Sequence, residues 1–97
     1  MHEQAIDIQK WTYEKFGPVV DWDLYIDRVI EELQELKASL MTRKKEDEEA
    51  EFADVFILLL RAVVERGIDI ELAIEQKMII NKNRQWTSVN GIGRSVK

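Results

Sequence analysis

Two pairs of carboxylates stand out in the 97-residue chain by their spacing. Glu32 and Glu35 are three positions apart, and Glu51 and Asp54 repeat that spacing. Residues three apart on a helix emerge on one side, so each pair can direct its two carboxylates to a common point. Converging carboxylates repel one another, and a hard cation with oxygen ligands, Mg²⁺ or Mn²⁺, relieves that repulsion. The spacing therefore predicts a divalent-metal site, although acidic pairs of this kind also occur on solvated helix faces.

The surroundings of Glu51 favour the metal site over a solvated surface. A helical wheel places Glu51 between Val55, Leu58 and Ala62, within an otherwise apolar arc. A carboxylate in apolar surroundings is costly unless a cation compensates its charge. The charged segment 43–47 contains no apolar residue and indicates the turn of a helical hairpin. Antiparallel helices joined by this turn would bring the two carboxylate pairs together.

A third group of residues, Lys77, Asn81 and Arg84, suits an anionic ligand. Their spacing of four and three positions places them on one face of a helix. Arginine can bind two phosphate oxygens at once and lysine acts as a point charge, so the group can hold a phosphate chain. The alternative is an ordinary basic helix end that is favoured by the helix dipole.

The elements that must position these side chains are helices. Apolar residues recur at three- and four-residue intervals, and the composition, 45% hydrophobic with four Gly and one Pro, is typical of a helix-rich protein. We expect an all-α, four-helix domain over residues 1–86 and an irregular tail over residues 87–97. Asp21 or Asp23 caps the second helix, Gly67 closes the third and Asp69 caps the fourth. The predicted helices span approximately residues 2–16, 23–42, 47–66 and 70–86.

The third predicted helix carries information about assembly. Its apolar residues include every position from 55 to 60 together with Phe52, Val63 and Val64, so they cover nearly every side. A helix that is apolar all round must be covered all round, and four short helices can hardly do this. We therefore expect a homo-oligomer in which this helix is shared between protomers and the bundle is completed. A self-sufficient monomeric bundle is the alternative.

The composition excludes several other classes of protein. The chain has no cysteine, which excludes disulfides, thiolate metal sites and cysteine nucleophiles, and we expect it in the cytoplasm. Its net charge of −5 argues against nucleic acid polymers and anionic membranes as partners. The longest apolar run, residues 55–60, is too short to cross a bilayer. The only histidine, His2, leaves no Ser-His-Asp triad and no Glu-x-x-His pair of a di-iron bundle.

Three segments of the chain together resemble a known family. Residues 31–36 (EELQEL), 51–55 (EFADV) and 77–84 (KMIINKNR) are similar to the E-x-x-E, E-x-x-D and K-x-x-x-N-x-x-R motifs of MazG-like, all-α nucleoside triphosphate pyrophosphohydrolases. The resemblance covers residues 23–86. It implies a magnesium-dependent enzyme that converts a (d)NTP and water into the (d)NMP and pyrophosphate, with deoxynucleotides as the expected substrates. It also implies a homodimer or a homotetramer.

The resemblance implies roles for individual residues. A carboxylate that is not fully engaged by metal can orient or deprotonate the attacking water, and Glu35 is our first candidate. By the resemblance, the metal ligands are Glu32, Glu35, Glu51 and Asp54, and the contacts to the phosphates or the sugar are Lys77, Asn81 and Arg84.

The sequence offers fewer signals for the nucleobase pocket and for the biological role. Trp11 and Trp86 can stack on a base, and so can Trp22, although tryptophan more often packs in a core or an interface. Removal of non-canonical nucleotides from the pool is the role that the resemblance suggests. Two alternatives stay open. One is a non-catalytic helical protein-interaction module that binds through the apolar third helix, and the other is a phosphoribosyl-ATP pyrophosphohydrolase of the same broad superfamily.

Overall fold

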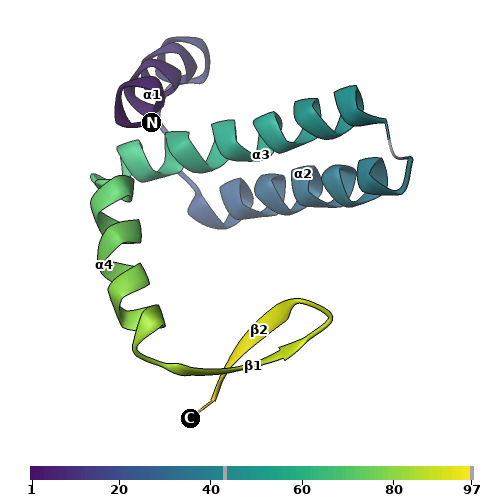
Figure 1. Cartoon of the computed structure of the whole chain (residues 1–97). Helices are drawn as coiled ribbons and strands as arrows, with labels where there is room; N and C mark the ends of the chain where they lie inside the picture. The colour runs from purple at the N-terminus through teal and green to yellow at the C-terminus, as the bar shows by residue number, and fades with distance from the viewer. Residues whose placement is uncertain (43, 97) are drawn as a thin grey trace.

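The computed structural model describes residues 1–42 and 44–96, and it confirms the predicted helical class. Four helices are followed by one β-hairpin (Figure 1). None of the described helices is both long enough and apolar enough to cross a membrane. Arg43, in the predicted turn, and Lys97, at the end of the predicted tail, lie outside the described residues. The elements are α1 (His2–Phe16), α2 (Trp22–Thr42), α3 (Lys45–Glu65), α4 (Ile70–Lys82), β1 (Gln85–Val89) and β2 (Ile92–Val96).

Local signals in the sequence account for the ends of the helices. Asp21, rather than Asp23, caps α2, because its Oδ1 accepts a hydrogen bond of 3.1 Å from the backbone amide three positions later. Asp69 caps α4 in the same way, also at 3.1 Å. Gly67 follows α3 with a φ of +70°, a conformation that glycine adopts without strain. α3 begins earlier than expected, at Lys45, because lysine and glutamate favour the helix.

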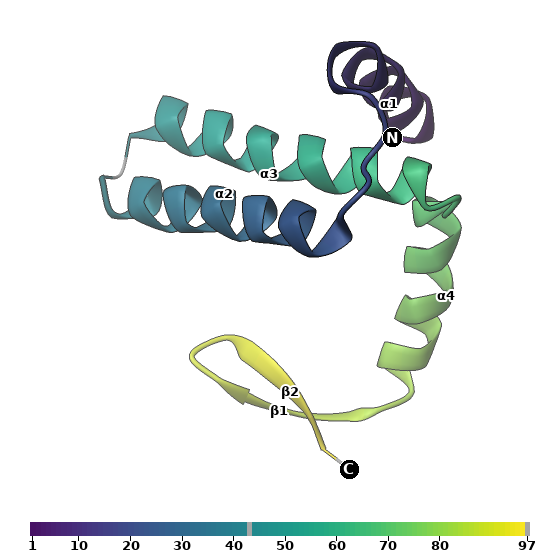
Figure 2. The ribbon, with the colours of Figure 1, turned by 180° about the vertical axis from the view of Figure 1, so that it is seen from behind.

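α2 and α3 run antiparallel and side by side, as the charged turn predicted, and α1 lies across the other end of α3 (Figure 1 and Figure 2). The hydroxyl of Tyr25 on α2 donates a hydrogen bond of 2.7 Å to the backbone carbonyl of Leu58 on α3. A small apolar core fixes the position of α2, which carries Glu32 and Glu35, relative to α3, which carries Glu51. Its buried apolar residues are Ala5, Tyr25, Val29, Leu36, Val55 and Leu60.

A buried ion pair fastens the connection between α1 and α2 to α3. Arg61 is 7% exposed, and its Nε lies 2.6 Å from Oε2 of Glu65. Nη2 of Arg61 donates to the carbonyl of Gly17 at 2.7 Å, and the amide of Val19 donates to Oε1 of Glu65 at 2.9 Å. The guanidinium also lies 5.7 Å from the centroid of the Tyr25 ring. These contacts pair both charges and hold α1 against α3.

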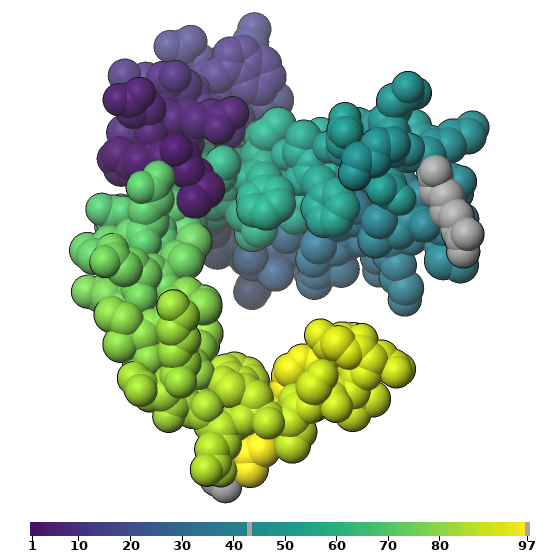
Figure 3. Space-filling view, viewed as in Figure 1, coloured from purple at the N-terminus to yellow at the C-terminus, as the bar shows by residue number. Residues whose placement is uncertain are grey.

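α4 leads away from the other helices instead of packing among them (Figure 1 and Figure 2). None of its residues is buried. The space-filling view shows open space between the β-hairpin and α2 even when side chains are drawn (Figure 3). The Cα radius of gyration is 15.9 Å, against about 12.5 Å for a compact chain of this length. The described chain therefore consists of a three-helix body and an arm, which is formed by α4 and the hairpin.

The segment that was expected to be an irregular tail is instead an antiparallel hairpin, with Gln85 paired to Val96 and Val89 to Ile92. Asn90 and Gly91 have φ angles of +52° and +78°, and positive φ at both central positions is typical of a type I′ turn. α4 correspondingly ends at Lys82 rather than near residue 86, because the chain enters β1. The division into a domain over residues 1–86 and a C-terminal segment stays a prediction.

Candidate active site

The structure brings three of the predicted carboxylates together. Glu32 and Glu35 on α2 and Glu51 on α3 each offer one oxygen, and these oxygens lie within 4.8 Å of one another. The antiparallel packing of α2 against α3 accounts for this meeting (Figure 1). Carboxylate oxygens gathered in this way can serve as ligands of a small, hard cation.

Two of these carboxylates carry a buried oxygen atom without a partner. Glu32 is 5% exposed; its Oε1 forms an ion pair of 2.5 Å with Nη2 of Arg28, whereas its Oε2 has no hydrogen-bond partner. Oε2 of Glu51 is likewise buried and unpaired. Such atoms have lost their hydration without compensation, which is costly unless another group supplies positive charge. The donor set therefore fits Mg²⁺ or Mn²⁺, which prefer carboxylate oxygens and water as ligands.

The electrostatics of Glu35 indicate the same shortage of positive charge. Glu35 is exposed, yet the negative charge of Glu32 raises the pKa of its carboxyl above the ordinary value of 4.5. The charge of Glu51 adds to this rise, and the charge of Arg28 opposes it. Because like charges retain the proton, a cation bound among these groups would compete with it.

The fourth predicted ligand, Asp54, lies outside the group of three. Its side chain is exposed, and it contributes no oxygen to the group within 4.8 Å. Asp54 follows Glu51 by three positions on α3, so both residues emerge on the same side of that helix. A ligand role for Asp54 stays a prediction.

The predicted phosphate contacts lie on the arm. Lys77 and Asn81 belong to α4, and Arg84 follows its end. Lys77 and Arg84 are exposed and Asn81 is half-buried. Both ribbon views show α4 leading away from the two helices that carry the carboxylates (Figure 1 and Figure 2). Within one chain, therefore, the basic group does not pack beside the carboxylate group.

The candidate base-stacking residues belong to different parts of the chain. Trp11 on α1 is 56% exposed and meets the Phe16 ring edge-on, with 6.0 Å between the centroids. Trp86 in β1 is 46% exposed, and its Nε1 donates a hydrogen bond of 2.7 Å to the carbonyl of Asn81, which ties the hairpin to α4. Trp22 is half-buried at the start of α2. The chain alone does not bring Trp11 and Trp86 together, because α1 and the hairpin lie on opposite sides of the α2–α3 pair (Figure 1).

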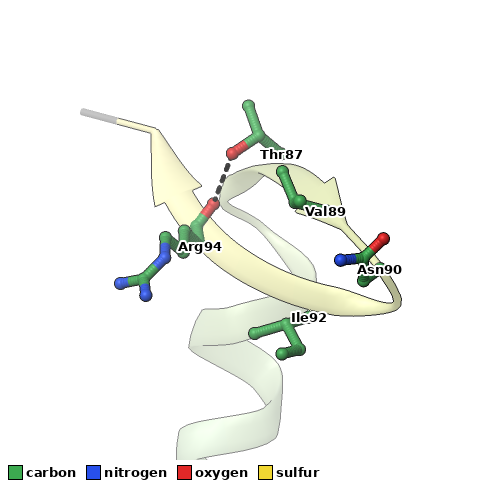
Figure 4. Close-up of a pocket in the computed structure, with 5 residues that line it drawn as sticks. All are labelled: Thr87, Val89, Asn90, Ile92 and Arg94. Atoms are coloured by element: carbon green, nitrogen blue, oxygen red, sulfur yellow. Dashed lines mark hydrogen bonds between the residues drawn. The ribbon is translucent and has the colours of Figure 1, made fainter.

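A pocket of about 300 Å³ lies on the hairpin (Figure 4). Across the strands, Oγ1 of Thr87 donates to the carbonyl of Arg94 at 3.5 Å. The lining contains one cationic side chain and no carboxylate, so this pocket is separate from the candidate metal centre. Its lining residues are Thr87, Val89, Asn90, Ile92 and Arg94.

One charged residue of the centre, Arg28, was missed by the sequence analysis. It precedes Glu32 by four positions on α2, and residues at this spacing on a helix are neighbours. The hydrogen bond to Glu32 is the main cause that raises the pKa of the Arg28 guanidinium, so this group stays cationic. Among the ion pairs of the described residues, only that of Arg28 reaches the three-carboxylate group.

Comparison with solved structures finds the same architecture. The chain matches a cyanophage S-2L MazG-like pyrophosphohydrolase bound to dGDP and three catalytic Mn²⁺ ions per active site, with a TM-score of 0.75 and 28% identity over 98% of this chain and 95% of that chain. Fold and carboxylate group together define a MazG-like nucleotide pyrophosphohydrolase. Residues 5–95 match the family model of dATP/dGTP pyrophosphohydrolases, and the chain belongs to that family. No curated protein matches it.

Proposed function

We propose that this pyrophosphohydrolase uses Mg²⁺ or Mn²⁺ to hydrolyse dATP and dGTP to the monophosphate and pyrophosphate. The observation that carries the metal dependence is the pair of buried, unpartnered oxygens of Glu32 and Glu51 within a group of three carboxylates. The family is named for the pyrophosphohydrolysis of dATP and dGTP, and the similar cyanophage protein binds dGDP and Mn²⁺. These likenesses support a deoxyribose and a purine base in the substrate of this chain.

The metal ligands of the proposal are Glu32, Glu35 and Glu51, joined by Asp54. Asp54 is exposed and emerges on the same side of α3 as Glu51, so rotation of its side chain can add a fourth carboxylate. A bound divalent cation supplies positive charge to the triphosphate and lowers the pKa of coordinated water. Glu35 is the most open to solvent of the three gathered carboxylates. We assign it to receive the proton of the water that breaks the bond between the α and β phosphates.

We infer that the substrate site is completed by a second copy of the chain, in a homodimer or a homotetramer. Five large apolar residues of α4 are 44% to 60% exposed, and those of α3 that face outward are 40% to 53% exposed. Where α4 leaves α3, a pocket of about 300 Å³ is lined only by apolar residues, among them Phe56, Leu59 and Ile74. Apolar surface of this extent is typical of a protein interface.

The second copy also resolves the separation between the basic group and the carboxylates. Lys77, Asn81 and Arg84 lie on an arm that leads away from the body of its own chain. An arm that is extended in this way can reach the body of a neighbouring copy. We propose that these three residues contact the triphosphate held at the neighbour's carboxylates.

The remaining assignments concern the base and the cellular role. Trp11 and Trp86 each keep about half of their surface exposed, and we propose that they stack on the purine in the assembled protein. The role we propose is the removal of unwanted deoxynucleotides from the pool. The cytoplasm is the proposed compartment, since the chain contains no cysteine.

The reaction is tested by product analysis with a panel of substrates. The panel contains ribo- and deoxynucleoside triphosphates and phosphoribosyl-ATP, each with Mg²⁺, Mn²⁺ or excess chelator. The expected products are dAMP or dGMP together with pyrophosphate, formed only with a divalent cation. Faster turnover of ribonucleotides would contradict the deoxy preference, and turnover of phosphoribosyl-ATP alone would favour the related enzyme class. Absence of turnover by the folded protein would favour the protein-interaction module.

A further inference from the structure

We propose that Arg28 is the resident counter-ion of the metal-free carboxylate group and that a divalent cation must displace it from Glu32. This inference rests on the proposed function, because it presumes that Glu32 is a metal ligand. It assigns Arg28 a positioning role: the arginine holds the carboxylate in place before the cation arrives and sets how tightly the cation binds.

The contact between the two residues is asymmetric. The side chain of Glu32 is 6% exposed, whereas that of Arg28 is 50% exposed, so the arginine reaches the carboxylate from the solvent side. Its Nη2 lies 2.5 Å from Oε1 of Glu32. A buried carboxylate that lost this cation without a replacement would stand uncompensated. The arginine, in contrast, can leave at little cost because half of its side chain is already in water.

A second acidic residue offers Arg28 an alternative partner. Oε2 of Glu31 lies 3.7 Å from Nη1 of Arg28, and the Glu31 side chain is 67% exposed. The guanidinium can therefore pair with Glu31 when it releases Glu32, since its donors point in several directions. Glu32 and Glu31 thus provide an inner and an outer place for one cationic group.

One arginine does not balance the carboxylate group. Three carboxylates meet within 4.8 Å, and Oε2 of Glu32 and Oε2 of Glu51 stay without a partner although Arg28 is in place. A divalent cation supplies more charge at a shorter range and can contact several of these oxygens. A cation bound at the free Oε2 of Glu32 places a second positive charge beside the guanidinium of Arg28, and the two positive charges repel each other. Arg28 therefore leaves Oε1 of Glu32 and pairs with Glu31 instead.

The first test is Mn²⁺ binding, measured by titration calorimetry without nucleotide. Arg28→Gln is expected to bind Mn²⁺ roughly tenfold more tightly than the native protein, which corresponds to about 1.4 kcal/mol, because no resident cation has to be displaced. Arg28→Lys keeps the charge but loses the planar fork, and its affinity is expected to lie between the two. Lys37→Gln is the matched control, since it removes one charge from an exposed position of the same helix. Its affinity is expected to equal that of the native protein.

The second test separates a counter-ion from an ordinary surface ion pair. Arg28→Gln is expected to lower the unfolding temperature by about 4 °C in chelator and to have no effect in saturating Mn²⁺, where the cation replaces the arginine. Equal Mn²⁺ affinities of native protein and Arg28→Gln, with the same temperature shift in both conditions, would overturn the inference and leave the proposed function intact. Absence of Mn²⁺ binding by the native protein would overturn both.

Discussion

Glu32 on α2 and Glu51 on α3 approach each other across the helical hairpin, and each keeps one buried carboxylate oxygen without a hydrogen-bond partner. Two like charges held together in poorly hydrated surroundings destabilise the fold that brings them together. We therefore interpret the two carboxylates as part of a site whose negative charge is compensated only when a cation binds. The relationship also connects stability to function, because the two carboxylates with an unpartnered oxygen belong to the group that would ligate the metal.

The first prediction is that divalent cations stabilise the protein. A ligand that binds only the folded state, present at about one hundred times its Kd, adds about 2.7 kcal/mol to the free energy of unfolding. Thermal unfolding in Mn²⁺ and in chelator measures this gain. Na⁺ at equal ionic strength serves as the control for simple screening. Identical unfolding temperatures in Mn²⁺ and in chelator would contradict the metal site.

The second prediction concerns pH and Glu35. The neighbouring charge of Glu32 raises the folded-state pKa of Glu35 above 4.5, so the contribution of this group to stability is fully present below that value and is lost as the pH rises through the folded-state pKa. In chelator at neutral pH, Glu35→Gln is therefore expected to be more stable than the native protein. The difference is expected to vanish toward about pH 4. Unfolding temperatures measured across this range check the sign, and a native protein that is the more stable one at neutral pH would contradict it.

The third prediction concerns the buried ion pair of α3 that holds the connection between α1 and α2. Removal of one partner leaves an uncompensated buried charge, so Arg61→Ala is expected to reduce the free energy of unfolding by about 3 kcal/mol. Denaturant unfolding measures this loss. Arg66→Ala is the control, because Arg66 is exposed and its guanidinium only lies over the Trp22 ring at 5.3 Å. If both variants lost a similar free energy of unfolding, the buried pair would stabilise the protein no more than the exposed contact of Arg66 does.

The fourth prediction tests whether the arm serves a neighbouring copy. Glu51→Gln damages the carboxylate group and Arg84→Ala damages the arm, so each variant alone is expected to be inactive. Co-expression with two different affinity tags yields hybrids that carry one copy of each. In a hybrid dimer one site combines the intact body with the intact arm, so about half of the native activity is expected. Purified hybrids without activity would mean that each arm serves its own chain.

Most of the helical framework could be predicted from the sequence because apolar periodicity and caps act locally. Asp69 caps the start of α4 and Gly67 follows the end of α3, as expected. The hairpin was missed because all residues of β1 and β2 are exposed, so no buried face imposes an alternation of apolar and polar side chains. The Asn90-Gly91 turn was the one local signal for it. The position of α4 could not be predicted, because an apolar helix face does not say whether its own chain or another copy covers it.

The carboxylate group could be predicted in part, because helical spacing and a short turn are also local signals. Spacing places Glu32 beside Glu35 on one helix face, and the short turn then brings α3 and Glu51 next to them. The side-chain position of Asp54 was not predictable, since helical spacing fixes the direction of a side chain and not its rotamer. Arg28 was not predicted although it stands four positions before Glu32, because oppositely charged residues at this spacing are common on exposed helix faces and do not by themselves mark a site.

The most direct test of the metal-dependent site measures pyrophosphate release from dGTP and Mn²⁺ binding on the same samples of native protein, Glu51→Gln and Glu49→Gln. Glu49 is an exposed glutamate of α3, so its variant makes the same chemical change outside the carboxylate group. Glu51→Gln is expected to lose more than about a hundredfold in both turnover and Mn²⁺ affinity, whereas Glu49→Gln is expected to behave as the native protein. Near-native turnover and Mn²⁺ affinity in Glu51→Gln would contradict the assignment of the active site.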